Sequence, residues 1–93
     1  MQQYGRKKII RHIAKDHSNV CFKPCGIQAK YLEKMMLDAD EMEAIRLSDY
    51  EGLYHQECAD KMGISRTTFS RILQQAHKKV SDALLHGKAI VMM

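Results

Sequence analysis

The sequence predicts an all-α fold: a helix-turn-helix bundle with a basic N-terminal arm and the residues for a short terminal β-pair. Two observations carry this prediction. Apolar residues recur at helical spacing on both sides of Gly63, and the residues around this glycine are of the kinds that end one helix and begin the next. We therefore assign residues 1–27 to the arm and residues 28–93 to the helix-turn-helix domain.

Length and composition fit one soluble domain. The chain has 93 residues, 45% of them hydrophobic, and no apolar run approaches the roughly 20 residues of a membrane span. The basic start, MQQYGRKK, is not followed by the unbroken apolar segment of a signal peptide. Three cysteines form no disulfide framework. We expect a cytoplasmic protein with no membrane partner.

Charge is segregated along the chain. Residues 1–34 hold 8 Lys and Arg against 2 acids, residues 35–63 hold 2 against 8, and residues 64–93 hold 5 against 1. These balances of +6, −6 and +4 sum to the net charge of +4. The arm and the last third of the chain are therefore two basic surfaces available for phosphate, unless they are simply solvated faces.

The arm has little regular pattern. Lys8–Ile13 is rich in β-branched residues and reads as a short strand, which could pair with residues 88–93. A turn at residues 24–26 contains the only proline. We expect Phe22 and Ile27 to anchor this turn to the core.

The first helix begins after Asp38. Asp38 and Glu41 have the spacing of a capping box, and acids near this end complement the helix dipole. The helix should bury Met42 and Ile45 and fade near residues 49–52.

Two further helices follow. The second spans about Tyr54 to Met62, where Gly63 ends it, and the third runs from Arg66 to about His86 with Ser65 as its N-cap. A helix of roughly 21 residues extends about 30 Å, longer than a DNA groove requires. Its C-terminal half therefore needs another partner, either the arm or a second subunit.

The third helix carries the expected function. The major groove of DNA admits one α-helix, whose first residues reach base edges. Polar side chains lie opposite the apolar stripe of this helix, and arginine can bond guanine in bidentate fashion. The expected base-reading residues are Arg66, Thr67, Thr68, Ser70, Arg71 and Gln74. The expected phosphate contacts are Ser65, Gln75, Lys78, Lys79, Arg6, Lys7, Lys8 and Arg11. Double-stranded DNA is the expected partner, read mainly by the two arginines.

Other readings remain open. A glycine turn between amphipathic helices can be a plain αα-corner, and the helix pair could instead dock another protein while the third helix drives dimerisation. A homodimer is favoured for a DNA reader because paired half-sites are common.

A metal site and an enzyme are weaker alternatives. His12, His17, Cys21 and Cys25 could bind zinc tetrahedrally, but their spacing lacks the usual tight pair. Cys58 lies on an apolar helix face, and no glycine-rich phosphate loop is present. We expect no catalytic activity and no cofactor.

Several blocks of sequence resemble one family. The blocks are FKP with Gly26-Ile27, DExEAIRL from Asp40, Glu51-Gly52-Leu53, MGISR from Met62 with Thr68-Phe69, Arg71-Ile72-Leu73 and Gly87-Lys88-Ala89. Together they are similar to an uncharacterised prokaryotic family of predicted DNA-binding proteins (UPF0251-like), over about residues 22–91. The reading unit of that family resembles region four of bacterial sigma factors. The resemblance implies a sequence-specific DNA-binding fold in a transcription regulator, with bases read just after the turn.

Overall fold

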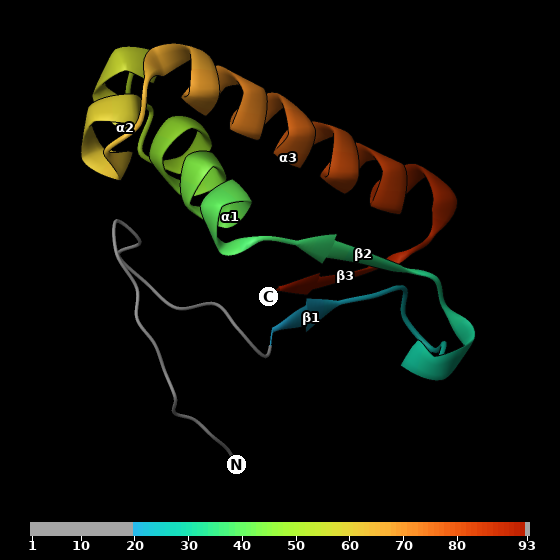
Figure 1. Cartoon of the computed structure of the whole chain (residues 1–93). Helices are drawn as coiled ribbons and strands as arrows, with labels where there is room; N and C mark the ends of the chain where they lie inside the picture. The colour runs from blue at the N-terminus through green and yellow to red at the C-terminus, as the bar shows by residue number, and fades with distance from the viewer. Residues whose placement is uncertain (1–19, 93) are drawn as a thin grey trace, which may run out of the picture.

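Helices dominate the computed structural model, which describes residues 20–92, and three short strands form one small sheet (Figure 1). In chain order the elements are β1 (Cys21–Phe22), the 3-10 turn η1 (Ala29–Tyr31), β2 (Lys34–Leu37), α1 (Ala39–Ile45), the π-helical turn η2 (Arg46–Tyr50), α2 (His55–Met62), α3 (Arg66–His86) and β3 (Ala89–Met92). None of the helices within residues 20–92 has the length and apolar character needed to cross a membrane.

The sheet is larger than the predicted β-pair. β3 lies in the middle, antiparallel to β1 and parallel to β2, so strand character at the end of the chain is confirmed. Lys8–Ile13, the partner expected for this strand, lies outside the described residues. Both edges of β3 are taken by other segments, because Val91 pairs with Cys21 on one side and with Met36 on the other. The prediction of an all-α fold was therefore too simple.

Two apolar clusters build the core along α3. The first joins α3 to α1, η2 and α2; its buried members are Ala44, Leu47, Cys58, Ala59, Met62, Phe69 and Leu73. The second joins α3 to the sheet through Leu37, Ala76 and Met92, with Val80 packed against them. Figure 1 shows α3 lying across α1 and the sheet, with α2 at its N-terminal end.

This arrangement accounts for the length of α3. Its C-terminal half was expected to need the arm or a second subunit, but the contacts run to β2 and β3 of the same chain. The strand β2 was missed because its parallel pairing with β3, between residues 34–37 and 89–92, joins segments that are far apart in sequence.

The turn before η1 is not anchored as expected. Phe22 and Ile27 are 61% and 42% exposed, so neither side chain belongs to the core. The physical reason is that β1 is an edge strand, while α3 packs mainly on β2 and β3.

A nearly buried ion pair connects α3 to the start of α1. Lys79 Nζ lies 2.9 Å from Glu41 Oε1 and donates to the carbonyl of Met36, also at 2.9 Å. The same Glu41 oxygen accepts from the backbone N–H of Asp38 at 2.9 Å, as expected for a capping carboxylate. Glu41 and Glu43 are both buried. Lys79 is therefore a structural residue in this geometry.

We expect Lys79→Met to lower the free energy of unfolding by about 2 kcal/mol, because it leaves a nearly buried carboxylate without its cation. Urea denaturation followed by circular dichroism measures this change. Lys78→Met is the matched control, since Lys78 is exposed and has no ion-pair partner in residues 20–92. Equal stability of the two variants would contradict the structural role of Lys79.

Candidate nucleic-acid interface

A tight turn joins α2 to α3. Gly63 ends α2 in the left-handed conformation (φ +72°), which favours glycine, and the N–H of Ile64 donates to the carbonyl of Ala59 at 3.0 Å. Ser65 then caps α3, since its Oγ accepts from the N–H of Thr68 at 3.1 Å. The predicted ends of both helices are confirmed, including the end of α3 at Gly87.

The outer face of α3 carries four exposed polar side chains. Thr67, Arg71, Gln74 and Lys78 follow one another at i, i+4, i+7 and i+11, so they form one stripe opposite the buried Phe69. None of the four side chains makes a hydrogen bond or ion pair to another residue of the described chain. We call this stripe the α3 outer face. Its donors and charges are available to a ligand.

Two of the expected base-reading residues are engaged inside the molecule. The hydroxyl of Thr68 accepts from Ser65 Oγ at 2.9 Å as part of the cap. Ser70 Oγ lies 3.1 Å from Nδ1 of His55, whose ring packs edge-on against Phe69 at 5.3 Å between centroids. Ser65 was expected to contact a DNA phosphate, but its hydroxyl likewise forms the N-cap of α3. These three residues therefore position the helix ends in this structure.

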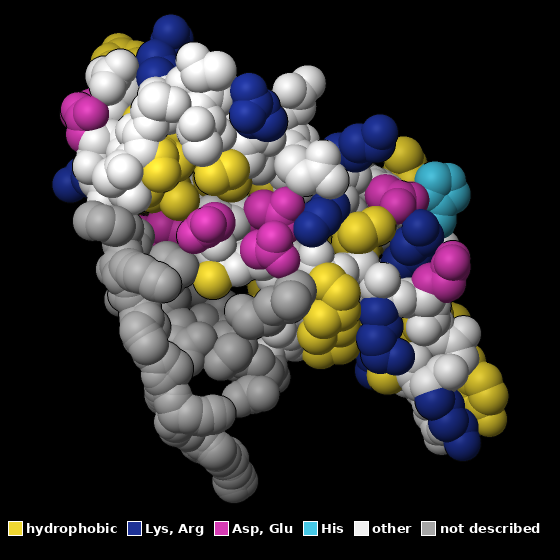
Figure 2. All heavy atoms as spheres, in the orientation of Figure 1, with side chains coloured by type: hydrophobic (Ala, Val, Ile, Leu, Met, Phe, Trp, Pro, Cys, Tyr) yellow, Lys and Arg dark blue, Asp and Glu magenta, His cyan; other side chains and the backbone are white. Residues whose placement is uncertain are grey.

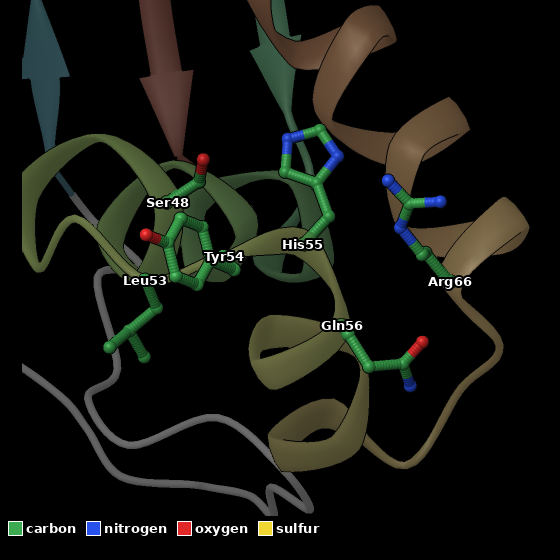
Figure 3. Close-up of a pocket in the computed structure, with 6 residues that line it drawn as sticks. All are labelled: Ser48, Leu53, Tyr54, His55, Gln56 and Arg66. Atoms are coloured by element: carbon green, nitrogen blue, oxygen red, sulfur yellow. The ribbon is translucent and has the colours of Figure 1, made fainter.

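A shallow hollow lies where α2 and α3 begin (Figure 3). Its lining residues are Ser48, Leu53, Tyr54, His55, Gln56 and Arg66. In the close-up, His55 and Gln56 of α2 lie between Tyr54 on one side and Arg66 of α3 on the other. The side chain of Arg66 bonds to no other residue within 20–92, and Tyr54 is 81% exposed. Of these lining residues, the sequence pattern indicated only Arg66 as a binding residue. The polar residues Tyr54, His55 and Gln56 at the start of α2 are the signal that could have indicated the others.

Acidic side chains gather over α1, and Lys and Arg side chains are spread along α3 (Figure 2). Further acids lie on α2 and near the C-terminal end of α3, where Asp82 pairs with Lys88. Arg46 belongs to the acidic side, where its guanidinium binds both carboxylate oxygens of Glu43 at 2.8 and 2.9 Å. This hydrogen bonding raises the pKa of Arg46. His77, adjacent to Lys78, lies 2.6 Å from Asp49 of η2 and so joins the two sides.

The remaining predicted site residues fall into two groups. Gln75 is exposed, as expected for a phosphate contact. The arm residues Arg6, Lys7, Lys8 and Arg11 lie outside the described residues, as do His12 and His17 of the zinc alternative. Cys21 and Cys25 are exposed free thiols, and residues 20–92 bring together no group of side chains suited to a metal ion.

Cys58 has the buried environment that its apolar helix face predicted. The side chain belongs to the first core cluster, and its Sγ lies 3.7 Å from the carbonyl of Leu53. Burial raises the pKa of this thiol, so the reactive thiolate is disfavoured.

Comparison with known proteins places the chain in a family. A family described as "Protein of unknown function DUF134" matches residues 1–93. The chain belongs to this family. It is 52% identical over 87 residues to a UPF0251 protein of Prosthecochloris aestuarii and 50% identical over 86 residues to one of Methanococcus vannielii. A UPF0251 protein of Aeromonas salmonicida is 49% identical over 87 residues.

These relatives differ in length. The alignments cover 94%, 92% and 94% of this chain, and 56%, 66% and 85% of the respective relatives. The chain thus spans between about half and two thirds of the first two curated relatives. No solved structure matches the chain.

We expect Ser65→Ala to lower the free energy of unfolding by about 1 kcal/mol, because the N–H of Thr68 loses its acceptor at the start of α3. Thermal or urea denaturation measures the loss. Ser65→Thr keeps a capping hydroxyl and should retain most of the stability. A Ser65→Ala variant as stable as the parent protein would show that the cap contributes nothing.

Proposed function

We propose that the protein binds double-stranded DNA sequence-specifically through a helix-turn-helix formed by α2 and α3, and acts as a transcription regulator. The observation that carries this proposal is the α3 outer face, where Thr67, Arg71, Gln74 and Lys78 are exposed and unpartnered within the described chain. A helix that begins directly after a tight glycine turn and presents such residues suits the major groove. The similarity to region four of sigma factors supports the same function.

Roles follow from position along α3. Arg71 and Gln74 are long side chains on one helix face, and we assign them to base edges, with Thr67 beside them. Lys78 lies a turn further on and is assigned to phosphate, together with Gln75. Thr68 and Ser70 are assigned to positioning, because their hydroxyls are already engaged.

The hollow at the start of α2 supports a phosphate contact next to the groove. Arg66 can supply a positive charge from one side, while Gln56 and Tyr54 can donate hydrogen bonds from the other. The first turn of α2 adds the positive end of a helix dipole. We therefore assign Arg66 to a contact with the DNA backbone at this hollow. We also keep it among the base-reading residues of α3, at their N-terminal end.

Binding as a cytoplasmic homodimer is part of the proposal. Leu84 and Leu85, near the C-terminal end of α3, are 75% and 78% exposed, so residues 20–92 leave them largely uncovered. Paired subunits would read paired half-sites and gain affinity. These leucines also favour the rival function, a protein-interaction module without DNA binding.

Selection from a randomised duplex pool tests the function directly. We expect a recurring motif to be enriched, with affinity that falls as salt concentration rises. The absence of both enrichment and salt-dependent duplex binding would remove the DNA proposal. Self-association under the same conditions would then favour the interaction module.

Arg71→Ala should weaken binding to the selected duplex by about 1–3 kcal/mol and relax the preference at one base position. Arg71→Lys is the informative companion, because it keeps the charge and loses the bidentate geometry. It should retain the salt dependence of the parent and lose the base preference. Unchanged preference in both variants would exclude Arg71 as a base-reading residue.

Lys78→Ala should weaken binding to all duplexes alike and reduce the slope of log K against log salt by about 0.9. Titrations at several salt concentrations measure the slope. Gln75→Ala changes a neutral exposed neighbour and should leave the slope unaltered. A sequence-dependent loss on Lys78→Ala would instead assign this lysine to a base.

A further inference from the structure

A second basic surface lies away from α3, around the turn η1. We call it the η1 surface and define it by Lys23, Lys30, Tyr31 and Lys34. Figure 1 places η1 at the far end of the sheet from the α2–α3 turn. The α3 outer face and the proposed helix-turn-helix function make no use of these residues.

Local contacts bring the three ammonium groups to the same turn. Lys23 Nζ donates to the carbonyl of Ile27 at 2.7 Å, and Lys34 Nζ donates to the carbonyl of Ala29 at 3.4 Å. These acceptors are two residues apart, and Lys30 stands between Ala29 and Tyr31 in the chain. Each ammonium has three donors, so every one of these lysines retains free donors for a ligand.

An exposed aromatic ring lies among these charges. Tyr31 is 72% exposed, and Lys30 Nζ lies 5.1 Å from the centre of its ring. That distance allows a cation–π contact, which helps hold the ring in place. Because Tyr31 is this exposed, the face of its ring that Lys30 does not cover is available to another flat group.

Little negative charge opposes this surface. Glu33 is the one acid in the sequence from residue 20 to residue 34. Its field acts on Lys88: the hydrogen bond that Lys88 donates to Asp82 chiefly raises the pKa of Lys88, and the charge of Glu33 adds to that effect. The three lysines of the η1 surface form no ion pair with any acid in the described chain.

We propose that the η1 surface binds single-stranded nucleic acid, with a base stacked on Tyr31 and the flanking phosphates held by Lys23, Lys30 and Lys34. Positive charge alone would suit the backbone of any nucleic acid. An exposed aromatic ring among cations is typical of sites that bind single-stranded nucleic acid, because unpaired bases can stack on the ring. A lipid surface would call for more apolar side chains than one tyrosine among three lysines. The proposal does not rest on duplex binding by α3.

The test uses the full chain and a short fluorescent oligothymidylate, with affinity measured by anisotropy. Tyr31→Ala should weaken binding about tenfold, while Tyr31→Phe, which keeps the stacking ring, should stay close to the parent. Changing Lys23, Lys30 and Lys34 together to glutamine should reduce the salt slope by about 2, whereas changing them to arginine should preserve it. Circular dichroism confirms that each variant is folded.

Several results would overturn the proposal. No binding of the oligonucleotide by the parent protein would do so, and so would equal binding by Tyr31→Ala and Tyr31→Phe. Loss of oligonucleotide binding on Arg71→Ala, with the η1 variants unaffected, would assign the activity to the α3 outer face. Lysine-dependent binding to phosphatidylserine vesicles, without binding to oligothymidylate, would identify a lipid site. We expect the η1 variants to bind duplex DNA as the parent protein does. A failure of this proposal can therefore be told apart from a failure of the proposed function.

Discussion

The contact between Lys79 and Glu41 fixes the arrangement of the molecule. Lys79 comes from the middle of α3, Glu41 from the first turn of α1, and the carbonyl of Met36, which also accepts from Lys79, from β2. Glu41 in turn accepts from the N–H of Asp38, where β2 passes into α1. One lysine therefore sets the position of α3 against both the helical and the sheet parts of the fold. Because the carboxylate is nearly buried, this geometry is required for its charge to be compensated.

The two halves of α3 have different supports because of this arrangement. Its N-terminal half packs on α1 and α2 through Phe69 and Leu73, and its C-terminal half packs on the sheet through Ala76 and Val80. A helix held along its whole length on one side presents its opposite side as a straight, rigid face. Rigid support is what a reading helix requires, since base contacts demand fixed positions of side chains. The small sheet thus serves the proposed function indirectly, by holding the far end of α3.

Local signals made the helices predictable, whereas contacts between distant segments did not appear in the sequence pattern. Gly63 and Ser65 act through their own backbone and nearest neighbours, so the ends of α2 and α3 could be predicted. The sheet could not, because β1 has two residues and the partner of β2 lies some 55 positions away in the chain. Lys78 and Lys79 look alike in sequence, and only the position of Glu41 separates an exposed lysine from a structural one. The engagement of Ser70 was hidden for the same reason, since its partner His55 belongs to another helix.

The bond from Lys79 to the carbonyl of Met36 also bears on whether a strand of another molecule can pair with β2. β2 is an edge strand, and edge strands with free backbone groups and apolar side chains invite the strands of other molecules to add on. A lysine that occupies one of those carbonyls places a positive charge and a bulky side chain where an incoming strand would pair. The other edge, β1, is only two residues long and offers little to extend. Both edges of the described sheet therefore offer a strand of another molecule fewer backbone groups to pair with.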